Sequence, residues 1–195
     1  MVAQLRDDFE NWIGSIDLTS TVPRLTLRPN ARFLSFNYTA VLQKVYGIFE
    51  ANVLHIHGSA ANSDRLIFGH GDEITEEPEL DENGDSNRHM YSDAESSAKA
   101  PLYAFKKQTA SIITENADWF HRLIGVRTVV VLGLSLNDID IPYIRQVHAS
   151  AHEACWIVSC YQPTDEEHHR SQLTKIGVQA SRITCCPIGD CDGHI

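Results

Sequence analysis

Three short apolar runs of this chain each end in polar or glycine residues that could take part in chemistry. They are Asn37 after the first run, His57 and Gly58 after the second, and Gly133, Ser135 and Asp138 after the third. An Asn side chain donates and accepts hydrogen bonds, a His transfers a proton near neutral pH, and a Ser or Asp binds hydroxyl groups. Because ligands of an open α/β sheet bind beyond the carboxyl ends of its strands, we expect these residues to line one cleft.

Each of these residues also has a purely structural interpretation. Asn37 and Asp138 can be helix caps, since Asn and Asp at a strand-to-helix turn accept hydrogen bonds from the first helical turn. His57 can be a hydrogen-bonded histidine without a ligand, and Gly133 can simply end a strand. The three-dimensional placement of these residues has to decide between the two interpretations.

Two histidines at alternate positions raise a metal site as another alternative. His55 and His57 would lie on one face of a strand, and His70 and Asp72 follow downstream. No third ligand stands at a diagnostic spacing, so we expect no metal and keep a metal-dependent hydrolase as an alternative. A serine nucleophile has less support, because the chain contains no Gly-x-Ser-x-Gly.

Hydrophobic periodicity predicts strands and helices that alternate along the chain. Helical spacing occurs over residues 3–15, 39–49, 101–124 (as one bent helix or two), 138–152 and 164–176. Short extended runs occur over residues 32–36, 52–57, 65–68, 128–132, 155–160 and 182–186. The run 128–132 is the most apolar and predicts a central strand. The alternation implies the α/β class, as a three-layer Rossmann-like domain with a mostly parallel sheet.

Length and charge narrow the classes of function. A chain of 195 residues, 43% of them hydrophobic, can bury roughly 70% of its unfolded surface, so we expect one domain over residues 1–195. Most of the net charge of −10 comes from the segment between Asp72 and Glu95, which contains ten acidic residues and a single basic one, Arg88. This pattern predicts a solvated acidic excursion over about 72–97, with a helical turn near 76–80. No basic stripe remains to bind nucleic acid.

The sequence shows no membrane or export signal. No apolar run approaches the roughly 18 residues of a membrane span, and the start from Met1 to Glu10 lacks the layout of a signal peptide. We therefore expect a cytoplasmic protein that does not contact a membrane. The five cysteines are an odd number placed late in the chain, which favours reduced thiols over a disulfide framework.

Four runs in a fixed order resemble a known protein family. They read FLSFNYT at 33–39, LHIHGS at 54–59, LIFGHG at 66–71 and VLGLSLNDIDIPY at 131–143. Together they are similar to the bacterial abortive phage-infection family AbiH. The order of an Asn-Tyr, a His-Gly and a Gly-x-Ser-x-x-Asp is also similar to the wider sirtuin-like group of NAD-binding and NAD-cleaving domains.

The resemblance implies an anti-phage defence protein with a sirtuin-like nucleotide pocket that hydrolyses NAD. Asn37 and His57 would be the catalytic pair, with His57 as general base and Asn37 orienting water or ribose. The residues that would bind the nucleotide are Gly58, Gly133, Ser135 and Asp138. NAD would be the substrate or ligand, and no metal is implied.

The chain departs from the family pattern in two places. Family members usually open with a strand and a Gly-Asn-Gly-Phe-Asp turn whose backbone amides would hold a pyrophosphate, whereas this sequence opens on a predicted helix. Leu134 stands where we expect a histidine. These departures support a second alternative, a truncated non-catalytic interaction module. In that case a partner chain, or a second copy in a homo-oligomer, supplies the missing element.

Overall fold

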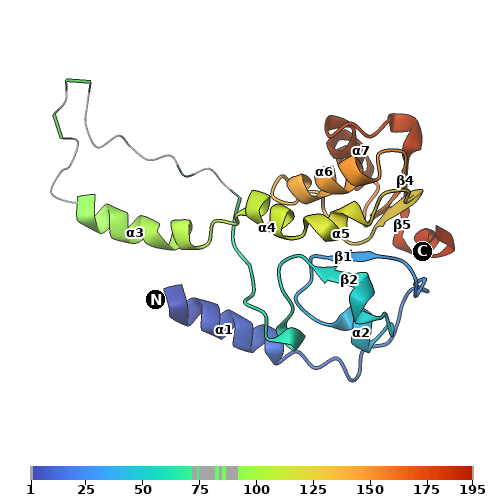
Figure 1. Cartoon of the computed structure of the whole chain (residues 1–195), viewed down its shortest axis with the longest axis horizontal. Helices are drawn as coiled ribbons and strands as arrows, with labels where there is room; N and C mark the ends of the chain where they lie inside the picture. Colours follow the sequence, from blue (N-terminus) through green and yellow to red (C-terminus); the bar gives the residue numbers. More distant parts are fainter. Residues whose placement is uncertain (1, 72–73, 75–81, 84, 87–91, 195) are drawn as a thin grey trace.

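A computed structural model describes residues 2–71, 74, 82–83, 85–86 and 92–194 (Figure 1). The described strands form two parallel sheets. β1 (Phe33–Ser35) pairs with β2 (Val53–His55), and β3 (Thr128–Val131), β4 (Cys155–Cys160) and β5 (Ile183–Pro187) pair in the order β3-β4-β5. The predicted α/β class with parallel strands is confirmed. Within the described residues, however, the strands are divided between two sheets.

Seven α-helices accompany these strands in the described part of the chain. They are α1 (Val2–Gly14), α2 (Val41–Lys44), α3 (Ser92–Ala104), α4 (Thr109–Glu115), α5 (Ala117–His121), α6 (Ile141–Ser150) and α7 (Asp165–Lys175). Short 3-10 turns are η1 (Glu50–Asn52), η2 (Ala60–Asn62), η3 (Ala180–Arg182) and η4 (Ile188–His194). None of the helices in the described ranges is long and apolar enough to cross a membrane.

Two predicted helical regions differ from the structure in extent. The region 39–49 is helical only over α2, because the chain turns at Gly47, whose φ of 67° is left-handed. The region 101–124 contains the end of α3 and then α4 and α5, which are separated at Asn116. α3 begins at Ser92, inside the predicted acidic excursion. Most of that excursion, including the helical turn predicted near 76–80, lies outside the described residues.

The predicted strand at 65–68 is wrong, because this segment forms no strand in the structure. The Leu66 N–H donates to Glu10 Oε1 of α1 at 3.1 Å. The Ile67 N–H donates to the His57 carbonyl oxygen at 2.9 Å. The Phe68 ring centroid lies 4.1 Å from that of Phe9 of α1, and Ile67 packs against the hydrophobic core, so burial does not require a strand ladder here.

The prediction of a central strand at 128–132 is also wrong for the sheet that the structure describes. β4 lies in the middle, with Trp156 and Val158 completely buried, whereas β3 is an edge strand that begins at exposed Thr128. A long apolar run indicates that the side chains of a strand are buried, but it does not indicate how many strands pair with that strand. Val129 and Val130 of β3 are half-buried and Val131 is buried, as suits an apolar edge strand.

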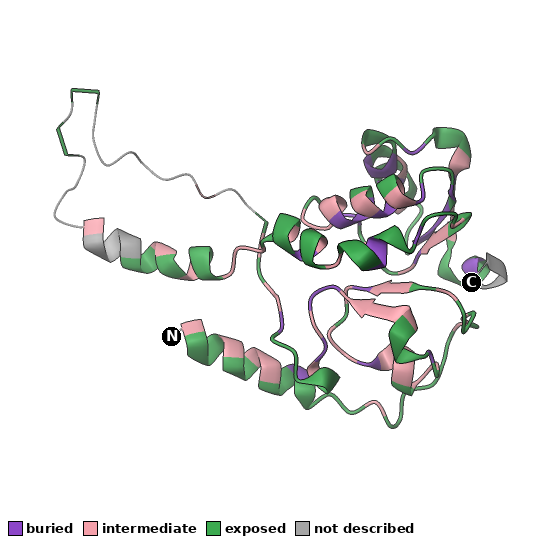
Figure 2. Ribbon diagram, viewed as in Figure 1, coloured by how far each residue is buried: buried purple, intermediate pink, exposed green. Residues whose placement is uncertain are grey.

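One hydrophobic core holds the two sheets together. Most of its buried residues come from β3–β5 and from α4–α7 (Figure 2). Leu34 of β1 and Leu54 of β2 pack against this same core. The loops that follow β1 and β2 are therefore held against α6, where Tyr143 lies.

Candidate functional site

His57 follows β2 and lies in the densest group of aromatic rings near the predicted site. It is only 2% exposed. Its ring centroid lies 5.4 Å from that of Tyr143, 5.7 Å from that of Phe36 and 6.3 Å from that of Tyr38. The Nε2 atom of His57 is buried and has no hydrogen-bond partner. A buried polar atom without a partner is costly, so this nitrogen is a candidate contact for a ligand.

The electrostatic surroundings keep the His57 ring neutral. Burial, and to a smaller extent the positive charge of Lys107, lower the pKa of His57 from 6.5 to about 4. A neutral imidazole offers one nitrogen that accepts a hydrogen bond or a proton. At neutral pH, His57 is therefore in the unprotonated form that a general base requires.

Three further residues act directly on His57, and a fourth, Asp140, acts on those three. We call the five together the His57 cluster: Tyr38, His57, Lys107, Asp140 and Tyr143. The Tyr143 side chain is completely buried, and its hydroxyl group has no hydrogen-bond partner. Burial and the nearby Asp140 raise the pKa of Tyr143, so its hydroxyl group keeps its proton and can donate it in a hydrogen bond. The cluster thus presents one imidazole nitrogen and one tyrosine hydroxyl group that nothing in the described chain engages.

Lys107 and Asp140 carry opposite charges. The positive charge of Lys107 acts on His57, and the negative charge of Asp140 acts on Tyr143. Burial lowers the pKa of Lys107 and raises the pKa of Asp140, and in each case the charge of the other residue opposes the shift. Tyr38 is anchored differently, because its hydroxyl group donates to the Ile67 carbonyl oxygen at 2.9 Å. Burial raises its pKa as well. None of these four residues was predicted from the sequence, although Tyr38, Asp140 and Tyr143 lie in the runs that carry the family resemblance.

Asn37 lies at the same sheet edge as His57. β1 and β2 run parallel with Ser35 opposite His55, so the residues that follow both strands leave the sheet at its carboxyl edge. Asn37 itself is exposed. Its backbone carbonyl oxygen accepts a hydrogen bond from His55 Nδ1 at 2.8 Å. The parallel pairing thus gives the two predicted catalytic residues a common edge, and their joint role stays a prediction.

Gly58 makes the turn that brings His57 into the core. Its φ is 85°, and its N–H donates to the His55 carbonyl oxygen at 3.0 Å. A Cβ atom at this position would lie 3.0 Å from the Arg65 carbonyl oxygen. The geometry thus explains the glycine by backbone conformation and close packing, and the predicted contact with a nucleotide stays a prediction.

The loop after β3 contains the other predicted binding residues, Gly133, Ser135 and Asp138. Gly133 has a φ of 63°, and its N–H donates to Ser159 Oγ of β4 at 3.0 Å. Asp138 accepts a hydrogen bond from Gln172 Nε2 of α7 at 3.1 Å. Asp138 is thus engaged in fixing the loop rather than in capping a helix.

Ser135 is exposed, and only its backbone carbonyl oxygen has a contact, from His168 Nε2 of α7 at 3.0 Å. One residue further on, Leu136 is completely buried and has a φ of 52°, a left-handed conformation that is rare for leucine. Side chains of β4 and α7 therefore hold this loop in a strained shape with Ser135 outward. Its contact with a nucleotide stays a prediction.

The three histidines of the metal alternative have different surroundings. His55 uses both ring nitrogens, with Nδ1 near the Asn37 carbonyl oxygen at 2.8 Å and Nε2 near Gln43 Nε2 at 3.0 Å. His70 Nε2 lies 2.9 Å from the Leu102 carbonyl oxygen. In the described ranges, no group of three or more His, Cys, Asp or Glu residues is arranged to hold a metal ion. Asp72 lies outside the described residues, and among those that are described this alternative gains no support.

Comparisons with known proteins give one match. A family model described as bacteriophage abortive infection AbiH matches residues 1–161, which include both strands β1 and β2 and the loop after β3. No curated protein and no solved structure matches the chain.

Proposed function

Because this chain belongs to the bacteriophage abortive infection AbiH family, we propose that it acts in phage defence by binding NAD beside His57 and hydrolysing it. The observation that carries the proposal is the unpartnered Nε2 atom of His57, buried next to an unpartnered tyrosine hydroxyl group. A three-layer sirtuin-like arrangement of the two sheets is part of this proposal. Family membership supports the defence role, and the His57 cluster supports the chemistry.

In the proposed reaction, His57 removes a proton from water. The water oxygen bonds to the ribose carbon as the bond between ribose and nicotinamide breaks, and the electron pair of that bond neutralises the positive nicotinamide nitrogen. Asn37, exposed at the same edge, would orient the water or the ribose. The Tyr143 hydroxyl group would donate a hydrogen bond to the sugar.

Lys107 links nucleotide binding to the basicity of His57. In the protein alone, a pKa of about 4 makes His57 a weak base. A pyrophosphate beside Lys107 would offset the positive charge that lowers this pKa. NAD binding would then bring His57 closer to the range in which a general base works well.

The second candidate function is a non-catalytic interaction module. It is favoured by the burial of His57, because only 2% of this residue is exposed and a ligand reaches Nε2 only if the surrounding rings move. In this case the His57 cluster stabilises the contact between the two sheets, and the defence role depends on a partner that binds elsewhere on the chain.

Nicotinamide release and NAD binding by the full chain separate the two candidates. The variants Asn37→Ala and Ser135→Ala replace exposed side chains, so the fold should be unaffected, and Asn30→Ala is a matched exposed control. We expect His57→Gln to lower turnover by about 10² or more. Asn37→Ala should also lower turnover, whereas Asn30→Ala should leave it unchanged.

Two results would count against NAD hydrolysis. Equal turnover in the wild type and in folded His57→Gln would remove His57 from the chemistry. Absence of both binding and turnover at about millimolar NAD, a binding free energy weaker than about −4 kcal/mol, would favour the interaction module.

A further inference from the structure

Four of the five cysteines gather at the carboxyl ends of β4 and β5 and in η4. The closest pair is Cys186 of β5 and Cys191 of η4, whose Sγ atoms lie 3.0 Å apart. All five cysteines are free in the structure. Two thiols in direct contact need little backbone movement to become a disulfide.

We propose that Cys186 and Cys191 are a redox modification site that forms a reversible disulfide when the protein meets a peroxide. This inference is independent of NAD chemistry, because it depends only on the geometry of these thiols. It concerns a part of the chain that lies beyond the matched family segment, which ends at residue 161.

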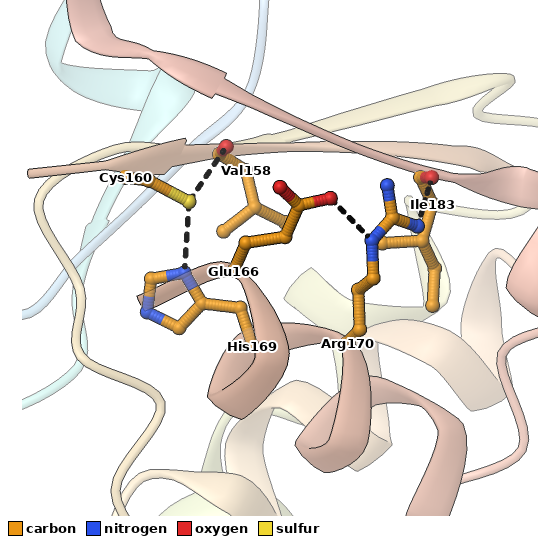
Figure 3. Close-up of polar contacts among 6 residues, drawn as sticks. All are labelled: Val158, Cys160, Glu166, His169, Arg170 and Ile183. Carbon is orange, nitrogen blue, oxygen red and sulfur yellow. Dashed lines mark hydrogen bonds and ion pairs between the residues drawn. The ribbon is translucent and has the colours of Figure 1, made fainter. Parts of the chain in front are cut away.

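The other cysteines have different surroundings. Cys155 is exposed at the start of β4, at the opposite end of the strand from Cys160. The Cys160 sulfur lies 3.6 Å from His169 Nδ1, and Figure 3 shows it turned towards this ring on α7. Cys185 precedes Cys186 in β5, so its side chain points to the other face of the sheet, where its thiol interacts with that of Cys160. Cys186 and Cys191 are the pair whose Sγ atoms lie 3.0 Å apart.

The exposure of the two residues sets the order of the steps. Cys186 is partly exposed and Cys191 is completely buried. Burial and the Cys186 thiol raise the pKa of Cys191 to about 12, so Cys191 stays protonated at neutral pH. Peroxide therefore reacts first at Cys186, and Cys191 acts as the second thiol.

The reaction consumes one peroxide and releases two waters. The Cys186 sulfur attacks one peroxide oxygen, the O–O bond breaks, and a sulfenic acid and one water form. The Cys191 sulfur then displaces the hydroxyl group of this sulfenic acid, which leaves as the second water, and the S–S bond forms. The two thiols together lose two protons and two electrons, and these reduce the peroxide to water.

The disulfide would join η4 to β5 close to the loop after β3. Cys186 lies opposite Ser159 in the parallel pair of β4 and β5. The Ser159 hydroxyl group in turn accepts the hydrogen bond from the Gly133 N–H. Oxidation would therefore fix the chain end one strand away from a predicted nucleotide-binding residue.

Peptide mapping of the full chain tests the proposal without any activity assay. The folded protein is treated with hydrogen peroxide, alkylated after unfolding and digested with trypsin. The peptide 183–195 contains Cys185, Cys186 and Cys191, and the peptide 146–170 contains the other two cysteines. We expect peptide 183–195 to lose the mass of two hydrogen atoms and to keep one alkylation site, whereas peptide 146–170 keeps both of its sites.

Cysteine variants identify the pair. In Cys185→Ser, the oxidised peptide 183–195 should carry no alkyl group, because its two remaining cysteines are joined. Cys155→Ser, the matched control, should form the disulfide as the wild type does. Treatment of the oxidised protein with a thiol reductant should restore all alkylation sites.

Three outcomes would overturn the proposal. One is a peptide 183–195 that stays fully alkylated after peroxide treatment, and another is irreversible oxidation of Cys186 without a disulfide. The third is a crosslink between peptides 146–170 and 183–195, which would place Cys160 in the bond. Because the mapping works on the wild-type chain, these outcomes can be observed even if Cys185→Ser does not fold.

Discussion

Replacing His57 by phenylalanine should make folding stability less sensitive to acid. In the folded protein, burial and Lys107 lower the pKa of His57 to about 4, whereas 6.5 applies to the unfolded chain. As the pH falls below 6.5, the unfolded chain binds a proton at this residue before the folded protein does. The stability contributed by neutral His57 is therefore present above the unfolded pKa and is lost as the pH falls towards the folded pKa.

The size of the effect follows from the two pKa values. At a pH below both pKa values, this difference lowers the free energy of unfolding by about 3 kcal/mol. Between about pH 7 and about pH 5, the wild type should lose about 2 kcal/mol of unfolding free energy through His57 alone. A phenylalanine ring of similar size does not titrate, so His57→Phe should lack this loss.

Urea unfolding at a series of pH values measures the effect, with Tyr38→Phe as the matched control. Tyr38→Phe changes the same cluster and removes the hydrogen bond to Ile67, but it removes no group that titrates in this pH range. Its stability should be lower at every pH and should run parallel to that of the wild type. If His57→Phe also runs parallel to the wild type, the imidazole is not buried in its neutral form, and the description of the site is wrong.

Further substitutions test other parts of the fold by the same unfolding measurement. Phe120→Ala empties a completely buried position and should cost about 3–5 kcal/mol; a loss below about 1 kcal/mol would contradict its place in the core. Gly69→Ala would drive a Cβ atom into the Phe105 carbonyl oxygen at a φ of 135° and should cost at least about 2 kcal/mol. In Gly133→Ala the new Cβ atom would have no neighbour within 4 Å, so the substitution should cost only about 1 kcal/mol of unfolding free energy for its φ of 63°. Equal losses of stability at Gly69 and Gly133 would refute the packing argument. Ser159→Ala removes the acceptor of the Gly133 N–H and should cost about 0.5–1.5 kcal/mol, and a neutral result would show that water replaces the hydroxyl group.

The positions of Asn37 and His57 could be predicted because they depend on local signals. Each follows a short apolar run, and parallel pairing brings such residues to one edge of a sheet. The division into two sheets could not be predicted in this way. Periodicity indicates that a run is extended and covered, but it does not name the strand that pairs with it.

The remainder of the His57 cluster was missed for a related reason. Lys107 lies 50 residues beyond His57, before α4, and follows no strand. Asp140 and Tyr143 were visible in the sequence as neighbours of Asp138, but only tertiary packing shows that Tyr143 lies against His57 and Asp140 near Tyr143, while Asp138 binds Gln172. A polar residue within an apolar helical pattern, such as Tyr143 in α6, was the signal that could have identified them.

The most direct test of the proposed function follows the His57 ring while NAD is added. Histidine ring resonances, assigned by comparison with His57→Gln, report on the environment of Nε2 in the full chain. We expect the His57 resonance to shift saturably with NAD, and Tyr143→Phe to change the size of the shift. A His57 resonance that stays unchanged while NAD is bound or hydrolysed would contradict the account, because the chemistry would then take place elsewhere.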